Sequence, residues 1–317
     1  QEILAKLNMT EEEFSALSPE KQQAILDELG VVIQQQKNTP EPKPTPEPSA
    51  QPTDNPSDVQ IEDIPVKTAV YSAVTANDVR DEAAMQATAQ RLKDMGVTDV
   101  VVTFKDAQGL VWFDTQTEMG GKAKSATVAD VKRLVEICEE KDVTLTAQLY
   151  VFQDRITPTV NRETAVKYKG TEMNWLDTSK EFGGKPWANP ASSAMQEYIY
   201  ALAKELMDMG VEEFIFSGVQ LPTGYSLEMR DFGVSDAQLQ AQMQGFINTL
   251  TSKVAAKGGD AYFAFDVKAV TGADVAKYIV APQRYGAANI IAAGTAEDFA
   301  AHGESAVAAL IKDENVE

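Results

Sequence analysis

Three aspartates stand directly after or at the end of apolar, β-rich segments, where they could carry acid–base chemistry: Asp106, Asp154 and Asp266. Cleavage of a glycosidic bond normally uses two carboxyl groups, about 5–5.5 Å apart for retention or about 6.5–9.5 Å apart for inversion of configuration. Any two of these aspartates could supply such a pair. Each also has a structural interpretation, because Lys105 and Arg155 could form ion pairs with them and Asp266 could cap a loop.

Aromatic residues accumulate in the same connecting segments. Trp112, Trp175, Trp187 and Tyr225 all lie in predicted loops. Aromatic faces beside carboxylates suit the binding of sugar rings, which stack on them while their hydroxyls make polar contacts. The alternative is that these side chains only pack the loops together. Asn189 likewise either serves a binding site or, with the proline that follows it, starts a helix as N-cap and N1 residues.

Composition excludes several classes of protein. The chain has one His and one Cys, so a Ser-His-Asp triad, a disulfide framework and a Cys- or His-rich zinc site are not expected. A net charge of −20 argues against nucleic acid as a partner. No run of about 18 apolar residues suggests a membrane span. No glycine-rich nucleotide-binding motif follows the first predicted strand, so we expect neither a cofactor nor a metal.

The elements that must position these residues alternate along the chain. Strands are predicted at 69–75, 99–104, 144–152, 213–218, 261–267 and 289–293. Helices are predicted at 81–95, 128–141, 193–209, 236–257, 273–280 and 296–312. In two of the joints, Gly96 and Gly210 follow the last helical turn and supply the C-cap before the next strand.

This alternation predicts a mainly parallel sheet with helical crossovers, in an α/β fold. Runs such as Val100-Val101-Val102 indicate strands that are buried on both faces. A (β/α) TIM-barrel-like fold and an open doubly wound sheet both fit. About six βα units are visible, two fewer than in a closed eightfold barrel. The barrel is therefore incomplete, or strands near Tyr278 and the C-terminus escape the pattern.

Three regions follow from the composition: a small helical segment at 1–37, a Pro-rich linker at 38–66 and an α/β barrel-like domain at 67–317. The linker contains seven prolines between residues 38 and 56, which favours an extended polyproline II spacer. The helical segment is too short for a large core. It is a tail, or an element for docking or oligomerisation.

Localisation is predicted from three features of the sequence. The chain opens at Gln1 without Met, it has a Pro-rich spacer, and it almost lacks cysteine. We expect an exported bacterial protein, extracellular or on the cell surface, with a membrane tether through a removed N-terminal segment as one option. The sequence leaves the oligomeric state open.

Four ordered segments resemble one protein family. They are Phe104-Lys105-Asp106-Ala107-Gln108-Gly109 with Trp112-Phe113 behind it, the segment 148–154, Trp187-Ala188-Asn189-Pro190, and the segment 210–222. Their order and spacing are similar to those of the bacterial putative glycosyl hydrolase domain family. Its members read Phe-Lys-Asp at one strand end, then Trp-x-Asp-Pro or Trp-x-Asn-Pro, then a strand ending Phe-Asp-Tyr-x-Arg-Phe-Pro. The resemblance covers roughly residues 68 to 270 and implies a TIM barrel that acts on or binds glycans.

The departures from this pattern bear on activity. Ser217-Gly218 stands where the family has Asp-Tyr, and Gln220 stands where it has Arg. The family's strand-four Asp is the residue expected to act as nucleophile or charge stabiliser. A serine hydroxyl is not ionised at neutral pH and does not stabilise an oxocarbenium-like centre as a carboxylate does.

Three hypotheses follow. The first, which the departures favour, is a catalytically degenerate barrel that binds a polysaccharide, cell-wall glycan or cell-envelope partner. The second is an active glycoside hydrolase that uses Asp106, Asp154 or Asp266. The third is a structural surface protein that assembles through its N-terminal segment. For the first two, the predicted binding residues are Lys105, Trp112, Trp187, Asn189, Ser217, Gln220 and Tyr225.

Overall fold

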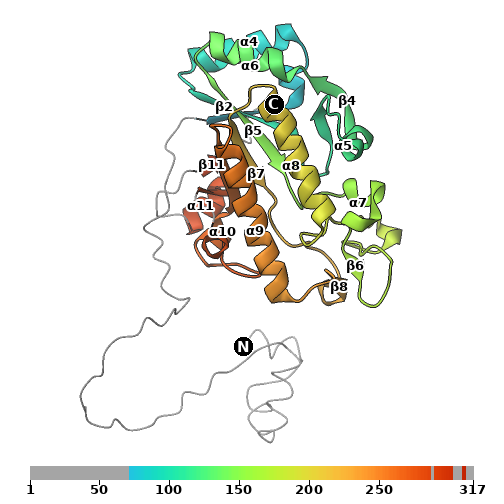
Figure 1. Ribbon diagram of the computed structural model, residues 1–317. Helices are drawn as coiled ribbons and strands as arrows, with labels where there is room; N and C mark the ends of the chain where they lie inside the picture. The colour runs from blue at the N-terminus through green and yellow to red at the C-terminus, as the bar shows by residue number, and fades with distance from the viewer. Residues whose placement is uncertain (1–70, 287–288, 303–308, 312–317) are drawn as a thin grey trace, which may run out of the picture. The chain divides into compact units, whose positions relative to one another are not determined.

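The computed structural model describes residues 71–286, 289–302 and 309–311 (Figure 1). All of them lie in the second of the two units into which the chain divides, residues 1–55 and 56–317. The predicted helical segment at 1–37 and the Pro-rich linker at 38–66 lie outside the described residues. The predicted start of the barrel domain, at residues 67–70, does so too.

Seven parallel strands form the central sheet. They are β1 (Tyr71–Val74), β2 (Asp99–Lys105), β5 (Thr144–Tyr150), β7 (Glu213–Ser217), β9 (Asp260–Asp266), β10 (Ile290–Gly294) and β11 (Ala309–Ile311). Each pairs in parallel with the next of the seven along the chain. This sequential order is that of a barrel, whereas a doubly wound sheet reverses its order at a switch point. The described residues do not include a pairing between β11 and β1 that would close the barrel.

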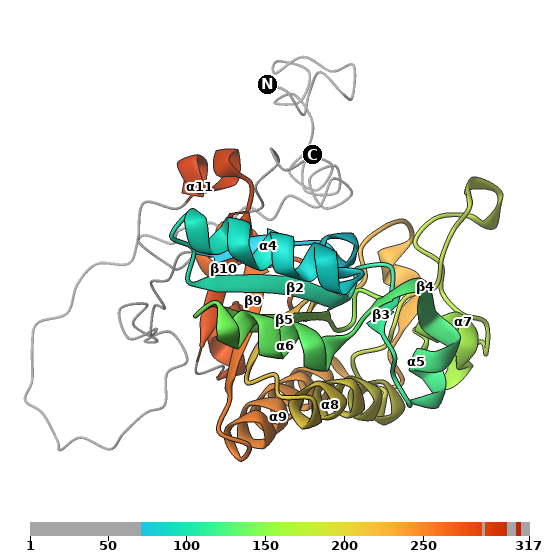
Figure 2. The ribbon, with the colours of Figure 1, turned by 90° about the horizontal axis from the view of Figure 1, so that it is seen from above.

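Four helices cover the outer face of this sheet (Figure 2). They are α4 (Glu82–Asp94), α6 (Val131–Glu140), α8 (Ser193–Asp208) and α9 (Asp236–Ala255). Each begins with an N-cap residue whose side-chain oxygen accepts a backbone N–H of the first helical turn; these caps are Asp81, Asp130, Ser192 and Ser235 respectively. The N-cap of α8 is therefore Ser192 and not Asn189, because the chain makes one more turn after Pro190 before the helix begins.

The strands alternate between two faces, as the period of two requires. On β2, Val100, Val102 and Phe104 are buried in the large core beneath the helices, while Val101 belongs to a second cluster inside the sheet's curve. That inner cluster is small, with Ile215, Ala264 and Ile291 as its other buried members. Polar side chains continue the inner face on β2 and β5, with Thr103 and Gln148 hydrogen-bonded to each other.

Two excursions interrupt the simple βα repeat. After β2 come β3 (Val111–Phe113), α5 (Glu118–Ala123) and β4 (Lys124–Ala129), which were not predicted. Trp112 therefore lies on a short strand and not in a loop. After β5 and β7, two long loops contain α7 (Thr157–Val160), η3 (Arg162–Thr164), η4 (Lys180–Phe182) and η5 (Leu227–Met229). These paired loops join through β6 (Lys167–Tyr168) and β8 (Arg230–Asp231).

The C-terminal third departs most from the predictions. No helix forms at 273–280, and a short α10 (Val267–Val270) stands before it instead. Gly272, with φ +77°, ends that turn, and the Lys277 carbonyl accepts the backbone N–H of Leu221 in the loop after β7. The last helix, α11 (Ala296–His302), is shorter than predicted. β11 replaces its end and supplies the strand suspected near the C-terminus.

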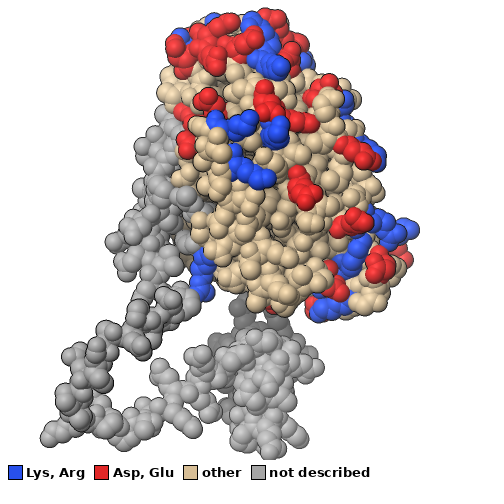
Figure 3. All heavy atoms as spheres, viewed as in Figure 1, with Lys and Arg blue, Asp and Glu red and all other residues tan. Residues whose placement is uncertain are grey.

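Charge is unevenly spread over the surface. Figure 3 shows acidic and basic side chains crowded over α4 and α6 and sparse over the lower part of α9. Arg133 on α6 links the first two helices, with its guanidinium 2.8 Å from Glu82 and 2.9 Å from Glu136. Within the described ranges, no helix is both long and apolar enough to cross a bilayer.

Candidate functional site

The parallel strands bring the predicted site residues to one edge of the sheet. Register pairs Lys105 on β2 with Leu149 on β5, and Tyr150 on β5 with Ser217 on β7. Asp266 ends β9, which pairs in parallel with β7. We call this edge, where β2, β5, β7 and β9 end, the C-terminal edge. Because active sites of barrels lie at this edge, it is the candidate site.

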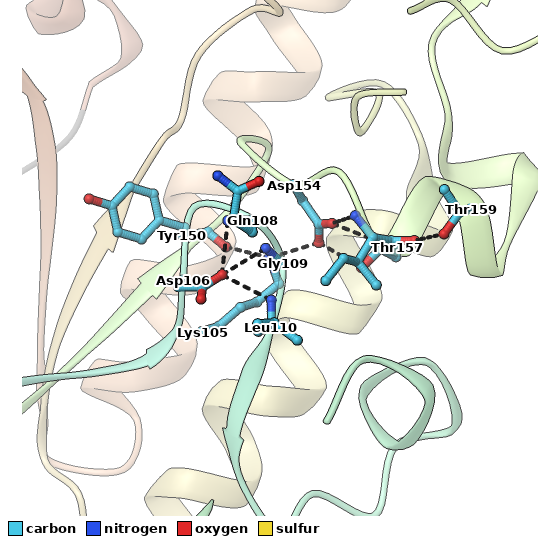
Figure 4. Close-up of polar contacts among 10 residues, drawn as sticks. Lys105, Asp106, Gln108, Gly109, Leu110, Tyr150, Asp154, Thr157 and Thr159 are labelled. Carbon is cyan, nitrogen blue, oxygen red and sulfur yellow. Dashed lines mark hydrogen bonds and ion pairs between the residues drawn. The ribbon is translucent and has the colours of Figure 1, made fainter. Parts of the chain in front are cut away.

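Asp154 is buried and fully engaged there (Figure 4). Its Oδ2 lies 2.8 Å from Lys105 Nζ and accepts the Thr157 hydroxyl at 2.6 Å. Its Oδ1 accepts the backbone N–H groups of Ile156 and Thr157 at 2.9 and 2.8 Å. Both partners of the ion pair are 0% exposed. Asp154 therefore has no oxygen turned to solvent, and Lys105, predicted to bind substrate, is held in the same way.

Lys105 completes its coordination with a 2.8 Å hydrogen bond to the Tyr150 carbonyl. Gly109 packs directly against the pair, since a Cβ at that position would overlap Oδ1 of Asp154. The ion pair thus joins the end of β2, the end of β5 and the turn between β2 and β3. In this arrangement it holds the two strand ends and the turn together.

Asp106 organises the turn that follows β2. Its Oδ1 accepts the backbone N–H groups of Gln108, Gly109 and Leu110 at 2.8, 3.0 and 3.0 Å. Its Oδ2 accepts Trp112 Nε1 at 3.1 Å. Four donors on one carboxylate explain the Lys-Asp-x-x-Gly pattern as a side-chain-capped turn. The same contact holds the half-buried Trp112 in place. Asp106 itself is still partly exposed to solvent.

Asp266 has a structural partner set as well. Its Oδ1 caps α10 by accepting the Lys268 N–H at 3.0 Å, and its Oδ2 lies 3.2 Å from Lys277 Nζ. Its side chain is 29% exposed. The sequence offered loop capping as the alternative to catalysis, and the capping geometry is present.

Ser217 stands at the end of β7 in a row of neutral groups. Thr103 donates its hydroxyl to Gln148 Oε1 at 2.7 Å, and Gln148 Nε2 donates to Ser217 Oγ at 3.0 Å. We call these three residues the inner ladder, because they connect β2, β5 and β7 across the inner face. Ser217 is 5% exposed. The position where the family pattern has an acid is thus filled by an uncharged hydrogen-bond acceptor.

Tyr150 is a residue of this edge that the sequence analysis did not select. Burial, and to a smaller extent the charge of Asp106, raises the pKa of its hydroxyl. Its ring also borders Gly218, where a Cβ would lie 3.3 Å from Tyr150 Cδ1 and 2.8 Å from Gln153 Cβ. Gly218 has φ +66°, which favours glycine. The space beside residue 218 is therefore already taken by β5 and its loop.

The tryptophans after β5 pack inside the paired loops. Trp175 and Trp187 are 0% and 1% exposed and form a cluster with Val166. Trp187 Nε1 donates to Asp177 Oδ2 at 3.2 Å, and Asp177 lies 3.0 Å from Arg155. With both faces covered, Trp187 cannot stack on a ligand in this conformation. The packing interpretation of the sequence fits these two residues.

Asn189 is also a packing residue, at 9% exposure. Its side chain donates to the Phe232 carbonyl at 3.2 Å and accepts the Ala191 N–H at 2.9 Å. It thus ties the loop after β5 to the loop after β7. Both polar atoms of this side chain are thus engaged within the loops.

Exposed aromatic residues remain on the paired loops. Tyr225 is 67% exposed, and Phe182, on the other loop, is 82% exposed. Both neighbour Asp177–Lys185, because Tyr225 N–H donates to the Asp177 carbonyl and η4 lies within that stretch. Gln220 follows β7 and is half-buried. It is polar, like the Arg of the family pattern, but it carries no positive charge. Of the predicted binding residues, Tyr225 is the most accessible.

In the described residues, no group of three or more His, Cys, Asp or Glu side chains is placed to hold an ion.

Comparison with known proteins adds the family. Residues 69–280 match the model of a family described as "Putative glycosyl hydrolase domain". The chain belongs to that family. The matched residues include five of the seven consecutive parallel strands of the barrel-type α/β fold.

One solved structure supports the fold, and two others are similar over part of their length. A hypothetical protein from Ruminiclostridium thermocellum superposes with a TM-score of 0.52 at 18% identity, over 62% of this chain and 96% of that one. A chitobiase of Flavobacterium johnsoniae gives 0.46 at 11% identity, over 71% and 34%. An exo-β-N-acetylglucosaminidase of Vibrio harveyi gives 0.45 at 10% identity, over 71% and 38%. The chain thus spans little more than a third of those two enzymes. A search of curated proteins gives no match.

Proposed function

We propose that this glycosyl hydrolase domain binds a glycan at its C-terminal edge without cleaving it. The observation that carries the proposal is the state of Asp154, which is wholly buried and engaged by Lys105, Thr157 and two backbone N–H groups. Ser217 supports it, since hydrolysis by the usual route needs a second carboxylate and Ser217 occupies the strand-four position without one.

The surface that would hold the glycan is supplied by the exposed aromatic side chains. Tyr225 and Phe182 present rings to solvent on the paired loops, and sugar rings stack on such faces. The inner ladder offers hydroxyl and amide groups, which exchange hydrogen bonds with sugar hydroxyls at no cost in charge desolvation. A neutral polysaccharide is the ligand class that fits best, because a chain of net charge −20 repels anionic polymers.

Retained hydrolysis is the competing function, and one observation favours it: Asp106 and Asp266 both keep partial exposure. Binding and turnover are therefore measured together. Residues 1–317 are titrated calorimetrically with soluble neutral polysaccharides and incubated with chromogenic glycosides under the same conditions. The proposal expects saturable binding without product. Turnover that disappears in Asp106→Asn or Asp266→Asn would establish the hydrolase instead.

The binding surface is tested with a matched pair of variants. Tyr225→Ala is expected to weaken binding about fivefold, the loss of ~1 kcal/mol of stacking. Met95→Ala is the control, since Met95 is 64% exposed but precedes β2 and so lies at the opposite edge of the sheet. Equal affinity in both variants would remove the aromatic surface from the proposal. No binding to any glycan would leave assembly through residues 1–37 as the function to pursue.

We also propose an extracellular or cell-surface location, supported by the Pro-rich stretch and the single cysteine. Protease treatment of intact cells tests it. Digestion of the chain while a cytoplasmic marker survives is the expected result, and survival of both would contradict it.

A further inference from the structure

A hollow of about 150 Å³ lies between α8 and α9, on the outer wall of the barrel. Phe246 and Leu250 form its buried floor. Its walls carry hydrogen-bonding side chains: Ser193, Gln196, Glu197, Tyr200, Thr249 and Lys253. The hollow has room for a small group such as a single ring and is open to solvent on one side.

The walls combine an aromatic ring with polar groups of zero net charge. Lys253 Nζ lies 3.5 Å from the centre of the Tyr200 ring, which places the ammonium against an aromatic face. Glu197 supplies the opposite charge. Gln196 donates to the Pro190 carbonyl at 2.7 Å, which fixes the plane of its amide.

Several of these side chains have spare hydrogen-bonding capacity. Within the described part of the chain, Ser193, Glu197 and Thr249 form no side-chain hydrogen bond or ion pair with the protein. All three are exposed. Among the described residues, the hollow therefore presents one carboxylate and two hydroxyls that no protein group engages, beside the ring of Tyr200.

The surface around the hollow is unusual for this chain. From Ala237 to Ser252, α9 contains no Lys, Arg, Asp or Glu, although charged residues make up 24% of the sequence. Its solvent-facing positions include Gln238, Gln242, Asn248, Thr249 and Ser252. Figure 3 shows this sparsely charged area over the lower part of α9. A helix face rich in amides and hydroxyls suits a neutral, hydroxyl-rich ligand, which offers many hydrogen bonds and no charge to pair.

We propose that the α8–α9 hollow is a second carbohydrate site, which takes one sugar ring of a neutral glycan between Tyr200, Thr249 and Glu197. To stack on Tyr200, the sugar ring either displaces the Lys253 ammonium from the face of the aromatic ring or packs against the part of that face that Lys253 leaves uncovered. This site is separate from the C-terminal edge and stands whether or not that edge binds glycan.

The test uses the full chain and amide chemical shifts. Uncharged tetrasaccharides of glucose, mannose, xylose and N-acetylglucosamine are titrated into ¹⁵N-labelled protein. The expected result is that one of them shifts the amides of 193–200 and 246–253 in a saturable way. A hyaluronan tetrasaccharide, which is anionic, is expected to leave those amides unmoved. The proposal is wrong if no neutral sugar moves them.

Variants assign the binding to the hollow. Tyr200→Ala is expected to weaken the interaction at least tenfold, and Tyr200→Phe, which keeps the ring, to change it less than threefold. Gln242→Ala is the matched control, on the same uncharged face but outside the hollow, and is expected to bind normally. If Tyr200→Ala melts early by circular dichroism, Thr249→Val and Glu197→Gln take its place, each expected to weaken binding.

Two other outcomes separate this site from its alternatives. If the sugar-induced shifts of the amides of 193–200 and 246–253 persist in Tyr225→Ala but are lost in Tyr200→Ala, the hollow binds sugar independently of the C-terminal edge. If they instead follow protein concentration without sugar, and sedimentation detects dimers, the face is an interface between copies of the chain and the proposal fails.

Discussion

The ammonium of Lys105 lies 2.8 Å from Oδ2 of Asp154, and neither side chain is exposed to solvent. The pair joins the end of one strand to the loop after its neighbour, so it orders the edge where a barrel enzyme would do its chemistry. Removing one partner leaves the other charge buried and unpaired, which is costly in a protein interior.

Lys105→Met is therefore expected to lower the free energy of unfolding by about 3–5 kcal/mol. Urea denaturation measures it. Lys122→Met is the control, because Lys122 lies 2.7 Å from Glu118 on the surface and such pairs contribute only about 0–1 kcal/mol. The double variant Lys105→Met with Asp154→Asn, which removes the charge but keeps an oxygen to accept the Ile156 and Thr157 N–H groups, should recover part of the loss. A double variant less stable than Lys105→Met would show that the pair's charge is not the cause.

Gly109→Ala is expected to destabilise the domain more than Gly96→Ala. Both glycines have positive φ, +100° and +72°, so both variants incur backbone strain of about 1–2 kcal/mol. Only at Gly109 would the new Cβ overlap Asp154, whereas nothing lies within 4 Å at Gly96. The difference between the two melting temperatures isolates the contact with Asp154. Equal melting temperatures would mean that the turn moves freely away from the ion pair.

Trp187→Ala is expected to cost about 3–5 kcal/mol, the usual loss for a large buried aromatic side chain. Phe182→Ala, at a position 82% exposed on the same loop, is expected to change stability by no more than about 0.5 kcal/mol. Chemical denaturation of the two variants checks both values. A stable Trp187→Ala protein with reduced glycan binding would return Trp187 to the list of ligand contacts.

Ser217→Asp is not expected to create hydrolysis. The substitution places a carboxylate where the family pattern has one, but Asp154 remains bound to Lys105 and Thr157 and supplies no second acid. We expect chromogenic glycosides to stay intact and stability to fall by about 1–3 kcal/mol, since Ser217 is 5% exposed. Ser217→Asn serves as the uncharged control of equal size. Turnover above that control would show that a competent acid survives at this edge.

Stability is expected to fall at alkaline pH through Cys138. Burial raises the pKa of this thiol from 9.0 to about 11, with the charge of Glu139 adding to the effect. Below pH 9 the thiol is neutral in the folded and the unfolded chain, so its full contribution is present. Between pH 9 and about 11 only the unfolded chain loses the proton, and the free energy of unfolding falls by about 2–3 kcal/mol.

The comparison of unfolding curves for the wild-type chain and Cys138→Ala between pH 8 and about 11 measures that contribution. The variant is expected to be less stable at every pH but to lose less stability across the window. Parallel pH profiles would assign the alkaline loss to the tyrosines instead.

Repetitive local signals made much of the fold predictable. The segment 99–104 corresponds to β2 within one residue, and 81–95 contains α4 with Asp81 as its N-cap. The segment 273–280 has helical composition but forms no helix. The Lys277 carbonyl in it accepts the backbone N–H of Leu221, a long-range contact that no local pattern reveals. The short strand Val111–Phe113 likewise exists because β4 lies beside it.

The site was predictable in place but not in chemistry. Consecutive βα units fix which strand ends share an edge, so the order of the elements alone predicts that Asp106, Ser217 and Asp266 follow or end neighbouring parallel strands. The ion-pair partners were not predictable from the sequence. Lys105 is adjacent to Asp106 in sequence, yet its ammonium pairs with Asp154, which follows the neighbouring strand β5. Burial of Trp187 depends in the same way on a loop distant in sequence.

The inner ladder of Thr103, Gln148 and Ser217 has a consequence for any molecule held above it. None of the three side chains gains or loses a proton near neutral pH. A hydrolase with two carboxyl groups works only within the bell-shaped window that their ionisations set. A ligand bound to this row meets the same hydrogen-bonding groups in an acidic medium as in a neutral one. Its affinity should therefore persist at a pH where a hydrolase with two carboxyl groups loses activity.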